Sequence, residues 1–365
     1  MIKWSATRVN TANYCRMKYY LAYVDPDKPK SLRLSAYVRG SFLHKMIEKF
    51  WARLGTPEEA AKKSSLKKYY DAESFGDYSR RKWQSIISAD DRMRVKYNEN
   101  VSKGNMEEAE EINEHLIYWK HDQEKWVIKG NMPKLCVPLF SHIIKEGKPL
   151  FSELPFDFVI NNRRFTGRID EVRKENGIII IRDYKSGRPW VGSEKRDFDP
   201  QLTMYNVGLC HLCQTDSEVK AKLGLEQSLI DKFMGNPIFV NPDFKVEFFM
   251  IDAFGINPSN PRINTVPPAI VPSERRDEHF FELMKMVEGT EESVNTGNIY
   301  PERGRKCDDC DMKAPCRQKL NDVRAGTLVD KKKQQYLSFV APLFIQKEEK
   351  PAPDQKKFRF RYPKE

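Results

Sequence analysis

Residues 151–185 read FSELPFDFVINNRRFTGRIDEVRKENGIIIIRDYK, and their pattern indicates the class of fold. Three runs within it are rich in β-branched and aromatic residues: 151–160, 164–172 and 177–184. The sequence Asn-Asn at 161–162 joins the first two runs, and Glu-Asn-Gly at 175–177 joins the last two. Both are typical of tight turns, so we predict an antiparallel meander of three strands. The four isoleucines at 178–181 indicate that the third strand is covered on both faces, as a central strand would be.

Helices and further strands are expected on either side of the meander. Apolar residues four apart predict a helix over 37–54 with one buried face. A proline near the first turn and an apolar stripe predict a helix over 200–213. Residues 244–251 form a further strand, and Ser273 is expected to start a helix that ends at residue 294. The segment 257–272 holds five prolines and is expected to be a loop or an edge element. The predicted class is α/β, with a central mixed sheet flanked by helices.

Changes in residue composition divide the chain into five segments. Residues 56–135 are polar and highly charged, and their Lys, Glu and Arg content favours helices, so we interpret them as a helical insertion. The other segments are N-terminal helices at 1–55, the core at 136–300, a cysteine-rich segment at 301–320 and a C-terminal extension at 321–365. The end of the extension is rich in Lys, Glu and Pro, and we expect it to be partly disordered.

The composition indicates a folded, intracellular protein that binds an acidic polymer. Its 63 Lys and Arg residues against 52 Asp and Glu give a formal net charge of +11, which suits nucleic acid as a partner. No uncharged apolar run approaches the roughly 20 residues needed to span a bilayer, and no signal peptide is recognisable. The seven cysteines are odd in number and unevenly spaced, which favours a reducing, cytoplasmic compartment and metal or cluster ligation.

Three short stretches carry the candidate chemistry. Asp183 and Lys185 project from the same face of the third strand, because side chains alternate along a strand. If Asp170 lies on the adjacent strand, two carboxylates and an ammonium group converge there. Paired carboxylates hold hard divalent cations such as Mg²⁺, and the lysine can help to position or deprotonate a metal-bound water. Gln201 and Tyr205 lie four apart and so share a helix face.

In order and context these motifs resemble those of the RecB-like nucleases of the PD-(D/E)xK superfamily. The resemblance implies a restriction-endonuclease-like core that hydrolyses phosphodiester bonds with Mg²⁺ or Mn²⁺. His44, in a Gly-x-x-x-His helix, would be a metal ligand together with Asp170 and Asp183. Lys185 would serve the attacking water. The remaining catalytic candidates are Glu153, Gln201 and Tyr205. By itself Glu153 could equally be a surface glutamate, and Tyr205 could simply pack in the apolar stripe of its helix.

Cysteines near the two ends of the chain form a second constellation. Cys307, Cys310 and Cys316 leave a four-ligand site one ligand short, and Cys15 is the candidate fourth. RecB-like nucleases that carry an iron-sulfur cluster, including AddB-type subunits and CRISPR-adaptation exonucleases, show the same split of one early and three late cysteines. The resemblance therefore implies a structural 4Fe-4S cluster, with zinc as the rival occupant. The other three cysteines, Cys136, Cys210 and Cys213, are expected to be unligated, and the last two to be buried thiols.

The resemblance implies a DNA exonuclease that prefers single-stranded ends and acts in DNA repair, recombination or processing, with a possible recombination or helicase partner. A structure- or site-specific DNA endonuclease is one alternative. A non-catalytic subunit that binds single-stranded nucleic acid is another. We expect the insertion to restrict the active site to single strands, by sterics and by stacking from residues such as Trp83 or Trp119. Those tryptophans could instead form the insertion's own small core.

Overall fold

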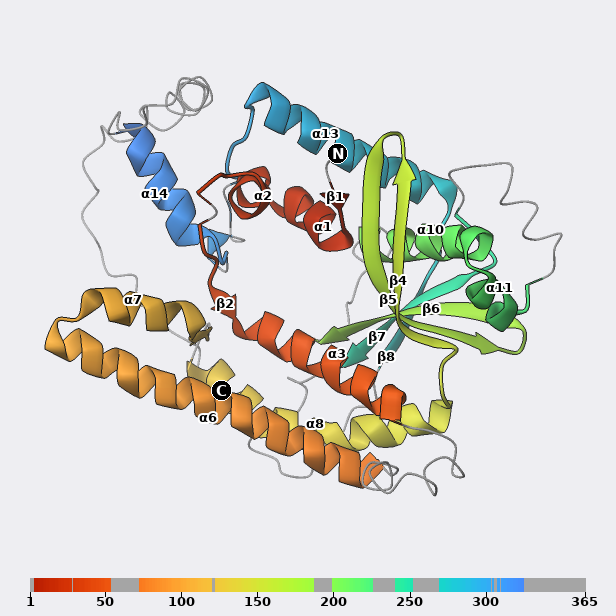
Figure 1. The fold of residues 1–365 in the computed structure, drawn as a ribbon, viewed down its shortest axis with the longest axis horizontal. Coiled ribbons are helices and arrows are strands. Elements are labelled where there is room, and N and C mark those ends of the chain that lie inside the picture. Colours follow the sequence, from red (N-terminus) through yellow and green to blue (C-terminus); the bar gives the residue numbers. More distant parts are fainter. Residues whose placement is uncertain are drawn as a thin grey trace, which may run out of the picture.

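The computed structural model describes residues 3–27, 29–53, 72–119, 122–186, 199–225, 240–251, 269–302, 304, 307, 308 and 310–324. They form a central mixed sheet with helices packed on both faces (Figure 1). The predicted α/β class and architecture are therefore confirmed. Among the helices of the described residues, none combines the length and the apolar character needed to cross a membrane.

The meander predicted from residues 151–185 is present in the sheet. Its strands pair antiparallel in sequence order and are β4 (Phe151–Ile160), β5 (Arg163–Glu175) and β6 (Ile178–Ser186). Asn161 and Asn162 have left-handed backbones, with φ of 50° and 60°. Asn176 and Gly177 repeat this at the second turn, with φ of 51° and 82°. Two consecutive left-handed residues match the right-handed twist of the flanking strands, which explains why these turns close the hairpins.

The remaining strands extend the sheet on both sides. The order is β1-β5-β6-β7-β8, and β4 also pairs with β5. The added strands are β1 (Lys3–Trp4), β7 (Lys245–Ile251) and β8 (Ala269–Ser273). β1 runs parallel to β5, β7 runs parallel to β6, and β8 runs antiparallel to β7. β6, which begins with the isoleucine run, lies between β5 and β7, so the prediction of a central strand is confirmed.

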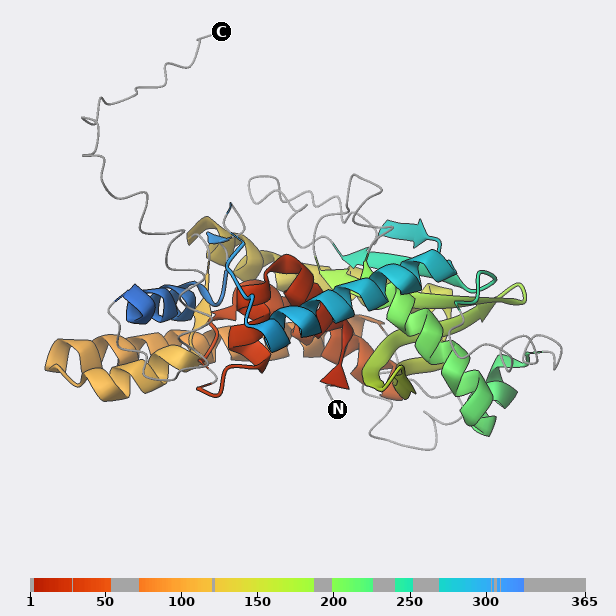
Figure 2. The ribbon, with the colours of Figure 1, turned by 90° about the horizontal axis from the view of Figure 1, so that it is seen from above.

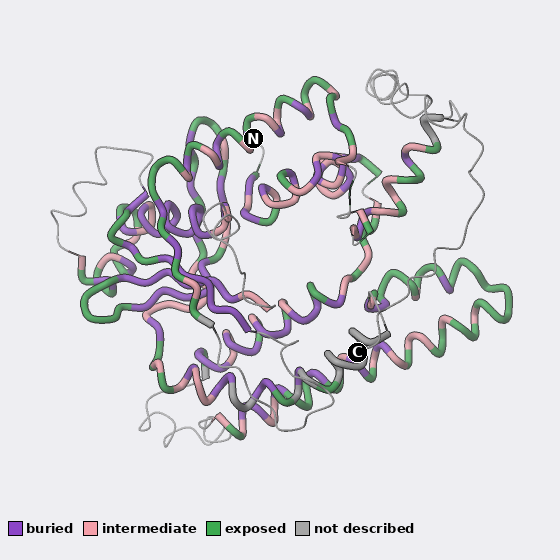
Figure 3. The backbone as a smooth tube through the Cα atoms, turned by 180° about the vertical axis from the view of Figure 1, so that it is seen from behind, coloured by how far each residue is buried: buried purple, intermediate pink, exposed green. Residues whose placement is uncertain are grey.

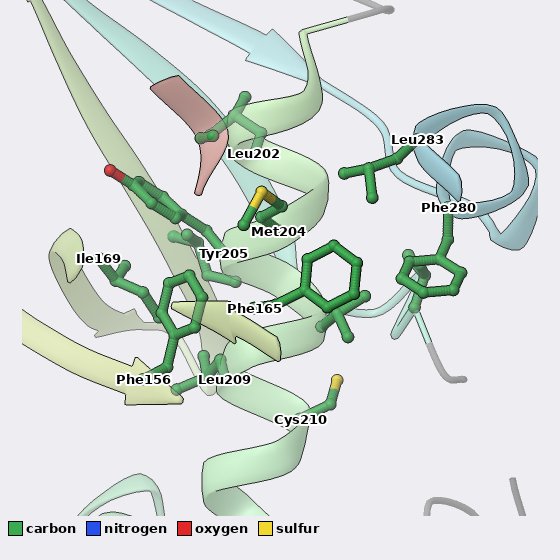
Figure 4. Packing of buried hydrophobic residues seen from close by; sticks show 14 of the residues in the cluster. Phe156, Phe165, Ile169, Leu202, Met204, Tyr205, Leu209, Cys210, Phe280 and Leu283 are labelled. Atoms are coloured by element: carbon green, nitrogen blue, oxygen red, sulfur yellow. The ribbon is translucent and has the colours of Figure 1, made fainter. Parts of the chain in front are cut away.

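Two helical layers enclose the sheet, as the views in Figures 1 and 2 show. One face is covered by α1 (Ala6–Tyr14), α10 (Pro200–Thr215) and α13 (Asp277–Thr296). The other is covered by α3 (Ser35–Arg53), α6 (Ala72–Lys103) and α8 (Asp122–Glu146). Each layer has its own apolar core, and the strands between them are largely buried (Figure 3). Figure 4 shows the first core, where α10 packs against the meander and α13.

Two expectations about the segment before α13 have different outcomes. Ser273 does not start a helix, because it pairs with Val246 and ends β8, and α13 begins only at Asp277. The prediction of an edge element for 257–272 is confirmed for residues 269–272, which belong to β8, the last strand of the sheet. Residues 257–268 and the C-terminal extension from residue 325 onward lie outside the described residues.

The described part of the insertion is mainly helical, and Trp83 and Trp119 belong to the core. It consists of α6, α7 (Met106–His115), the short strand β3 (Ile117–Tyr118) and most of α8. β3 pairs with β2 (Arg33–Leu34), directly before α3. Trp83 is 1% exposed and lies 5.1 Å from the ring of Phe42 in α3, so its expected role in stacking on bases is wrong. Trp119 is half-buried against the same core. The boundary predicted after residue 135 falls inside α8.

Candidate active site

Adjacent strands bring two carboxylates to one place in the sheet. Glu171 on β5 pairs with Arg182 on β6. The next position is Asp170 on β5 and Asp183 on β6, and both side chains are buried. Asp183 and Lys185 share a face of β6, as the alternation of side chains predicted.

His44, Glu153 and Asp170 form a group of possible metal ligands. The Nδ1 atom of His44 lies 3.5 Å from Asp170 Oδ1 and 3.9 Å from Glu153 Oε1. Among the described residues this is the one trio whose ligand atoms all lie within 4.8 Å of one another. Burial by itself would lower the pKa of His44, but the carboxylates of Asp170 and Glu153 raise it well above its ordinary value. The group therefore attracts positive charge, and its oxygen and nitrogen ligands fit Mn²⁺ or Mg²⁺.

A second carboxylate lies beside this group and pairs with the lysine. Asp183 Oδ2 is 2.8 Å from Lys185 Nζ. Burial raises the pKa of Asp183 to about 8, the Lys185 ammonium opposes this shift, and the nearby Asp170 adds to it. Burial would lower the pKa of Lys185, yet the partner Asp183 raises it. A bound cation would offset the repulsion between the two aspartates, because opposite charge at this distance favours both ionised forms.

Gln201 connects the lysine, the aspartate and the tyrosine. Its side-chain oxygen accepts a hydrogen bond from Lys185 Nζ at 2.7 Å. Its amide nitrogen lies 2.6 Å from Asp183 Oδ1 and 2.7 Å from the hydroxyl of Tyr205. Gln201 sits in the first turn of α10, where the Asp199 side chain caps the helix by accepting from the Gln201 backbone N–H at 2.8 Å. The helix start therefore aims the amide at the end of β6.

Tyr205 belongs both to the core and to the site. Its ring is 4% exposed and packs against Phe156, with the hydroxyl oxygen at the edge of the cluster (Figure 4). That hydroxyl donates to Asp170 Oδ1 at 3.3 Å. Tyr205 therefore has both expected positions: it packs in the apolar stripe of its helix, and it borders the site. Tyr205 links the group around Asp170 to the group around Lys185.

The structure brings all seven candidate residues into one connected cluster: His44, Glu153, Asp170, Asp183, Lys185, Gln201 and Tyr205. No role was expected from the sequence for Asp199 or for Tyr184. Asp199 directly before Pro200 is a recognisable helix cap, so that signal was present. Tyr184 acts through its main chain, donating to Asp170 Oδ2 at 2.8 Å and lying 2.9 Å from His44 Nε2 through its carbonyl oxygen. No side-chain pattern reveals such contacts.

The four candidate cluster ligands also come together. Cys15, Cys307, Cys310 and Cys316 line one pocket with a volume of about 380 Å³. The pocket lies between α2 (Arg16–Tyr23) and α14 (Lys313–Arg324), which pack side by side (Figure 1). None of the seven cysteines forms a disulfide. Cys136 is buried in α8, and Cys210 and Cys213 are buried in the core around α10. The helix α11 (Ser217–Leu223) follows α10.

The chain matches a family of known proteins over most of its length. The family is described as the PD-(D/E)XK nuclease superfamily, and the match covers residues 3–317. It therefore includes the seven clustered site residues and all four cysteines of the pocket. Comparison with curated proteins gave no match.

Proposed function

The chain belongs to the PD-(D/E)XK nuclease superfamily, and from this premise we propose that it is a metal-dependent DNA exonuclease that prefers single-stranded ends. Membership makes it a nuclease, a hydrolase whose substrate is a nucleic acid. The choice of DNA, of ends and of single strands is supported by its resemblance to the RecB-like nucleases. The same resemblance supports a role in repair, recombination or processing, with a recombination or helicase partner.

The observation that carries the proposal is that a group of possible metal ligands lies next to a lysine–aspartate pair. His44, Glu153 and Asp170 offer three ligand atoms within 4.8 Å of one another. Lys185 lies on the adjacent strand with its ammonium 2.8 Å from Asp183. A structural salt bridge would need no neighbouring trio of ligands, whereas phosphodiester hydrolysis needs both a cation site and a cationic side chain.

Each residue of the cluster has a proposed role. His44, Glu153, Asp170 and Asp183 would hold Mg²⁺ or Mn²⁺, which when bound polarises a phosphoryl oxygen and lowers the pKa of a coordinated water. Lys185 would orient the attacking water and stabilise developing negative charge through its ammonium group. The other two residues, Gln201 and Tyr205, would keep Lys185 and the carboxylates in place through the hydrogen bonds described above.

Selection for single strands is proposed to be steric. The helices α3, α6 and α8 form a continuous packed layer on one face of the sheet, and α3 carries His44 into the site. Because the side chain of Trp83 is buried in that layer, the proposal does not include stacking of bases on Trp83. The formal net charge of +11 suits attraction of a nucleic-acid backbone.

We propose that the four pocket cysteines hold an iron-sulfur cluster. All four line one pocket between α2 and α14, and both a zinc ion and a cubane cluster take four such ligands. The resemblance to RecB-like nucleases with one early and three late cysteines supports the cluster over zinc. The group would join Cys15 to the distant segment around Cys310, and its role would be structural.

The test of the proposed activity uses three labelled substrates of equal length: a linear single strand, a single-stranded circle and a blunt duplex. We expect the wild type to degrade the linear single strand fastest with Mg²⁺ or Mn²⁺ and to leave the circle intact. Chelation of the metal should stop the reaction. Cleavage of the circle would establish an endonuclease instead, and binding without cleavage of any substrate would establish a non-catalytic subunit.

A matched pair of variants tests the site itself. Lys185→Met should abolish cleavage while preserving DNA binding, because many basic residues contact backbone phosphates. Lys222→Met is the control, since Lys222 is an exposed lysine that pairs with Glu218 of its own helix, α11. Equal activity of the two variants would place the catalytic centre elsewhere.

A further inference from the structure

An aromatic side chain is exposed on the same helix that carries His44. Tyr37 lies in the first turn of α3 and is 52% exposed. His44 follows seven residues later, so the two side chains lie on the same face of the helix, about 10 Å apart along its axis. Between them on this face lies Ser41, which is small and exposed. The face therefore leads from an accessible tyrosine ring to the group of possible metal ligands without a bulky side chain in between.

This part of α3 packs against the end of the strand that carries Lys185. Ser186 directly follows Lys185 and is the last residue of β6. A Cβ atom placed at Gly40 would lie 3.5 Å from Ser186 Oγ. Arg39 Nη2 donates to the carbonyl oxygen of Ser186 at 3.4 Å. The helix therefore runs from β2 toward the sheet (Figure 1) and reaches the end of β6 within one turn of Tyr37.

The ring of Tyr37 is held at its hydroxyl edge. Lys18 Nζ of α2 lies 3.3 Å from the hydroxyl oxygen and 5.9 Å from the ring centre, so the ammonium lies beyond the hydroxyl and not over the ring. Lys18 is held in turn by Asp311 at 2.5 Å, and an ammonium group has enough donors for both partners. A side chain that is already held in place loses less conformational freedom when a ligand binds to it.

A base of a single strand is the ligand that best fits such a ring. Bases stack on exposed aromatic side chains in proteins that bind single strands, and every base has a face that can do so. Inside a duplex those faces are covered by the neighbouring base pairs. The separation of about 10 Å between Tyr37 and His44 corresponds to about three nucleotides, at roughly 3.4 Å per nucleotide of a stacked strand. A base on Tyr37 would thus belong to the strand whose phosphate lies at the cation site.

We propose that Tyr37 is a substrate-binding residue that stacks on one base of single-stranded DNA, about three nucleotides from the bond that is cleaved. The inference deepens the proposed function and rests on its substrate and its cation site. It names a residue that favours single strands over duplex, in addition to the steric selection proposed above. Trp83 is buried under α3, whereas Tyr37 presents its ring on the surface of that helix.

The test measures binding of a short, end-labelled single strand to the full-length protein by fluorescence anisotropy, with a chelator present so that no cleavage occurs. Tyr37→Ala should raise the Kd about 5- to 150-fold, the range typical of the loss of one base stack. Tyr37→Phe keeps the ring and loses only the hydroxyl contact with Lys18, so its Kd should stay near that of the wild type. Phe281→Ala is the control, because Phe281 is 57% exposed on α13, in the layer on the other face of the sheet. It should bind like the wild type.

Two further substrates separate stacking from general binding to phosphates. Strands with one abasic position, moved along the sequence, should bind the wild type most weakly when the missing base is the one on Tyr37. In Tyr37→Ala that position should cost nothing further, because a base and a ring that stack on each other do not act additively. A relaxed circular duplex, used as an unlabelled competitor, should have the same affinity for both proteins.

Several outcomes would overturn the inference. These are unchanged single-strand affinity in Tyr37→Ala, an equal loss in Tyr37→Phe or Phe281→Ala, and an abasic profile in Tyr37→Ala that matches the wild type. A fall in duplex affinity as large as the fall for the single strand would also overturn it, because phosphate contacts would then explain both. A wild type that binds no single strand would instead overturn the substrate of the proposed function, and the inference would fall with it.

Discussion

Glu153 takes the β4 position opposite Asp170 of β5, where the ladder of paired residues is interrupted, and its backbone is in the left-handed region at a φ of 55°. The pairs on either side, Ser152 with Glu171 and Leu154 with Ile169, keep a regular register. A left-handed glutamate inside a strand is strained, because its Cβ approaches the following carbonyl oxygen. The strain coincides with the carboxylate that faces His44, which is where backbone strain is commonly found in functional sites.

The strain at Glu153 predicts an unusual order of stability. Glu153→Gly and Glu153→Ala both delete the carboxylate, and both should weaken Mn²⁺ binding. The glycine variant should nevertheless be more stable than the alanine variant by about 1 kcal/mol, because glycine adopts the left-handed region without penalty. In an ordinary strand glycine is the less stable of the two. Urea denaturation of both metal-free variants measures the difference, and a more stable alanine variant would show that Glu153 is unstrained.

The contacts of Gln201 predict that the site needs a neutral amide at this position. Gln201→Met removes the hydrogen bonds to Lys185, Asp183 and Tyr205, and we expect kcat to fall about 10- to 100-fold, as for other residues that orient a metal site. Gln201→Glu should be more damaging, because a carboxylate would replace the amide nitrogen 2.6 Å from Asp183 Oδ1. The measurement is the rate of nuclease cleavage at saturating substrate. Activity in Gln201→Glu equal to the wild type would exclude the amide contact to Asp183.

Close packing around Phe156 leaves no room for a side chain at two glycines, Gly167 and Gly208. A Cβ at Gly208 of α10 would lie 2.7 Å from the ring of Phe156, so Gly208→Ala should destabilise the protein by about 1–3 kcal/mol. Phe156→Leu in the same chain should recover part of this loss, a coupling that a double-mutant cycle measures. Gly130→Ala in α8 is the control, because nothing lies within 4 Å of its Cβ position, and it should stabilise slightly. Strict additivity of the two substitutions would argue against the contact.

Local signals in the sequence were sufficient for the meander. Alternating strands and turns such as Asn161-Asn162 are set by neighbours in the chain, and the structure has the corresponding left-handed residues. The clustering of Asp170 with Asp183 followed from the adjacency of β5 and β6. These parts of the fold and the site were predictable because each depends on contacts within a short stretch of chain.

Features that depend on distant contacts could not be predicted. Ser273 resembles a helix cap, but pairing with Val246 places it in β8, and sheet pairing outweighs a cap worth about 1 kcal/mol. Trp83 could be assigned to the core only once α6 was seen against α3. The backbone of Glu153 and the main-chain contacts of Tyr184 leave no trace in residue type. The strained and main-chain parts of the site are therefore those that required the structure.

The cysteine pocket predicts a coupled loss of colour and stability. Lys18 of α2 and Asp311, which follows Cys310, form an ion pair of 2.5 Å beside the pocket. Apolar contacts of Met17 and Leu21 with Met312 and Leu320 add to this ion pair, and a ligated cluster would also join the two segments covalently. Replacement of a ligand should therefore loosen α14 from α2.

In anaerobically purified protein, Cys310→Ser should remove the visible absorption of an iron-sulfur cluster and lower the melting temperature, because the tie between Cys15 and the C-terminal segment is lost. Cys136→Ser is the control for loss of a buried thiol, since Cys136 lies in α8 outside the pocket. It should keep the colour, and any fall in its melting temperature would reflect core packing alone. A colourless wild type with one zinc per chain would reject the cluster but keep the four ligands. Full colour in Cys310→Ser would reject the ligand set.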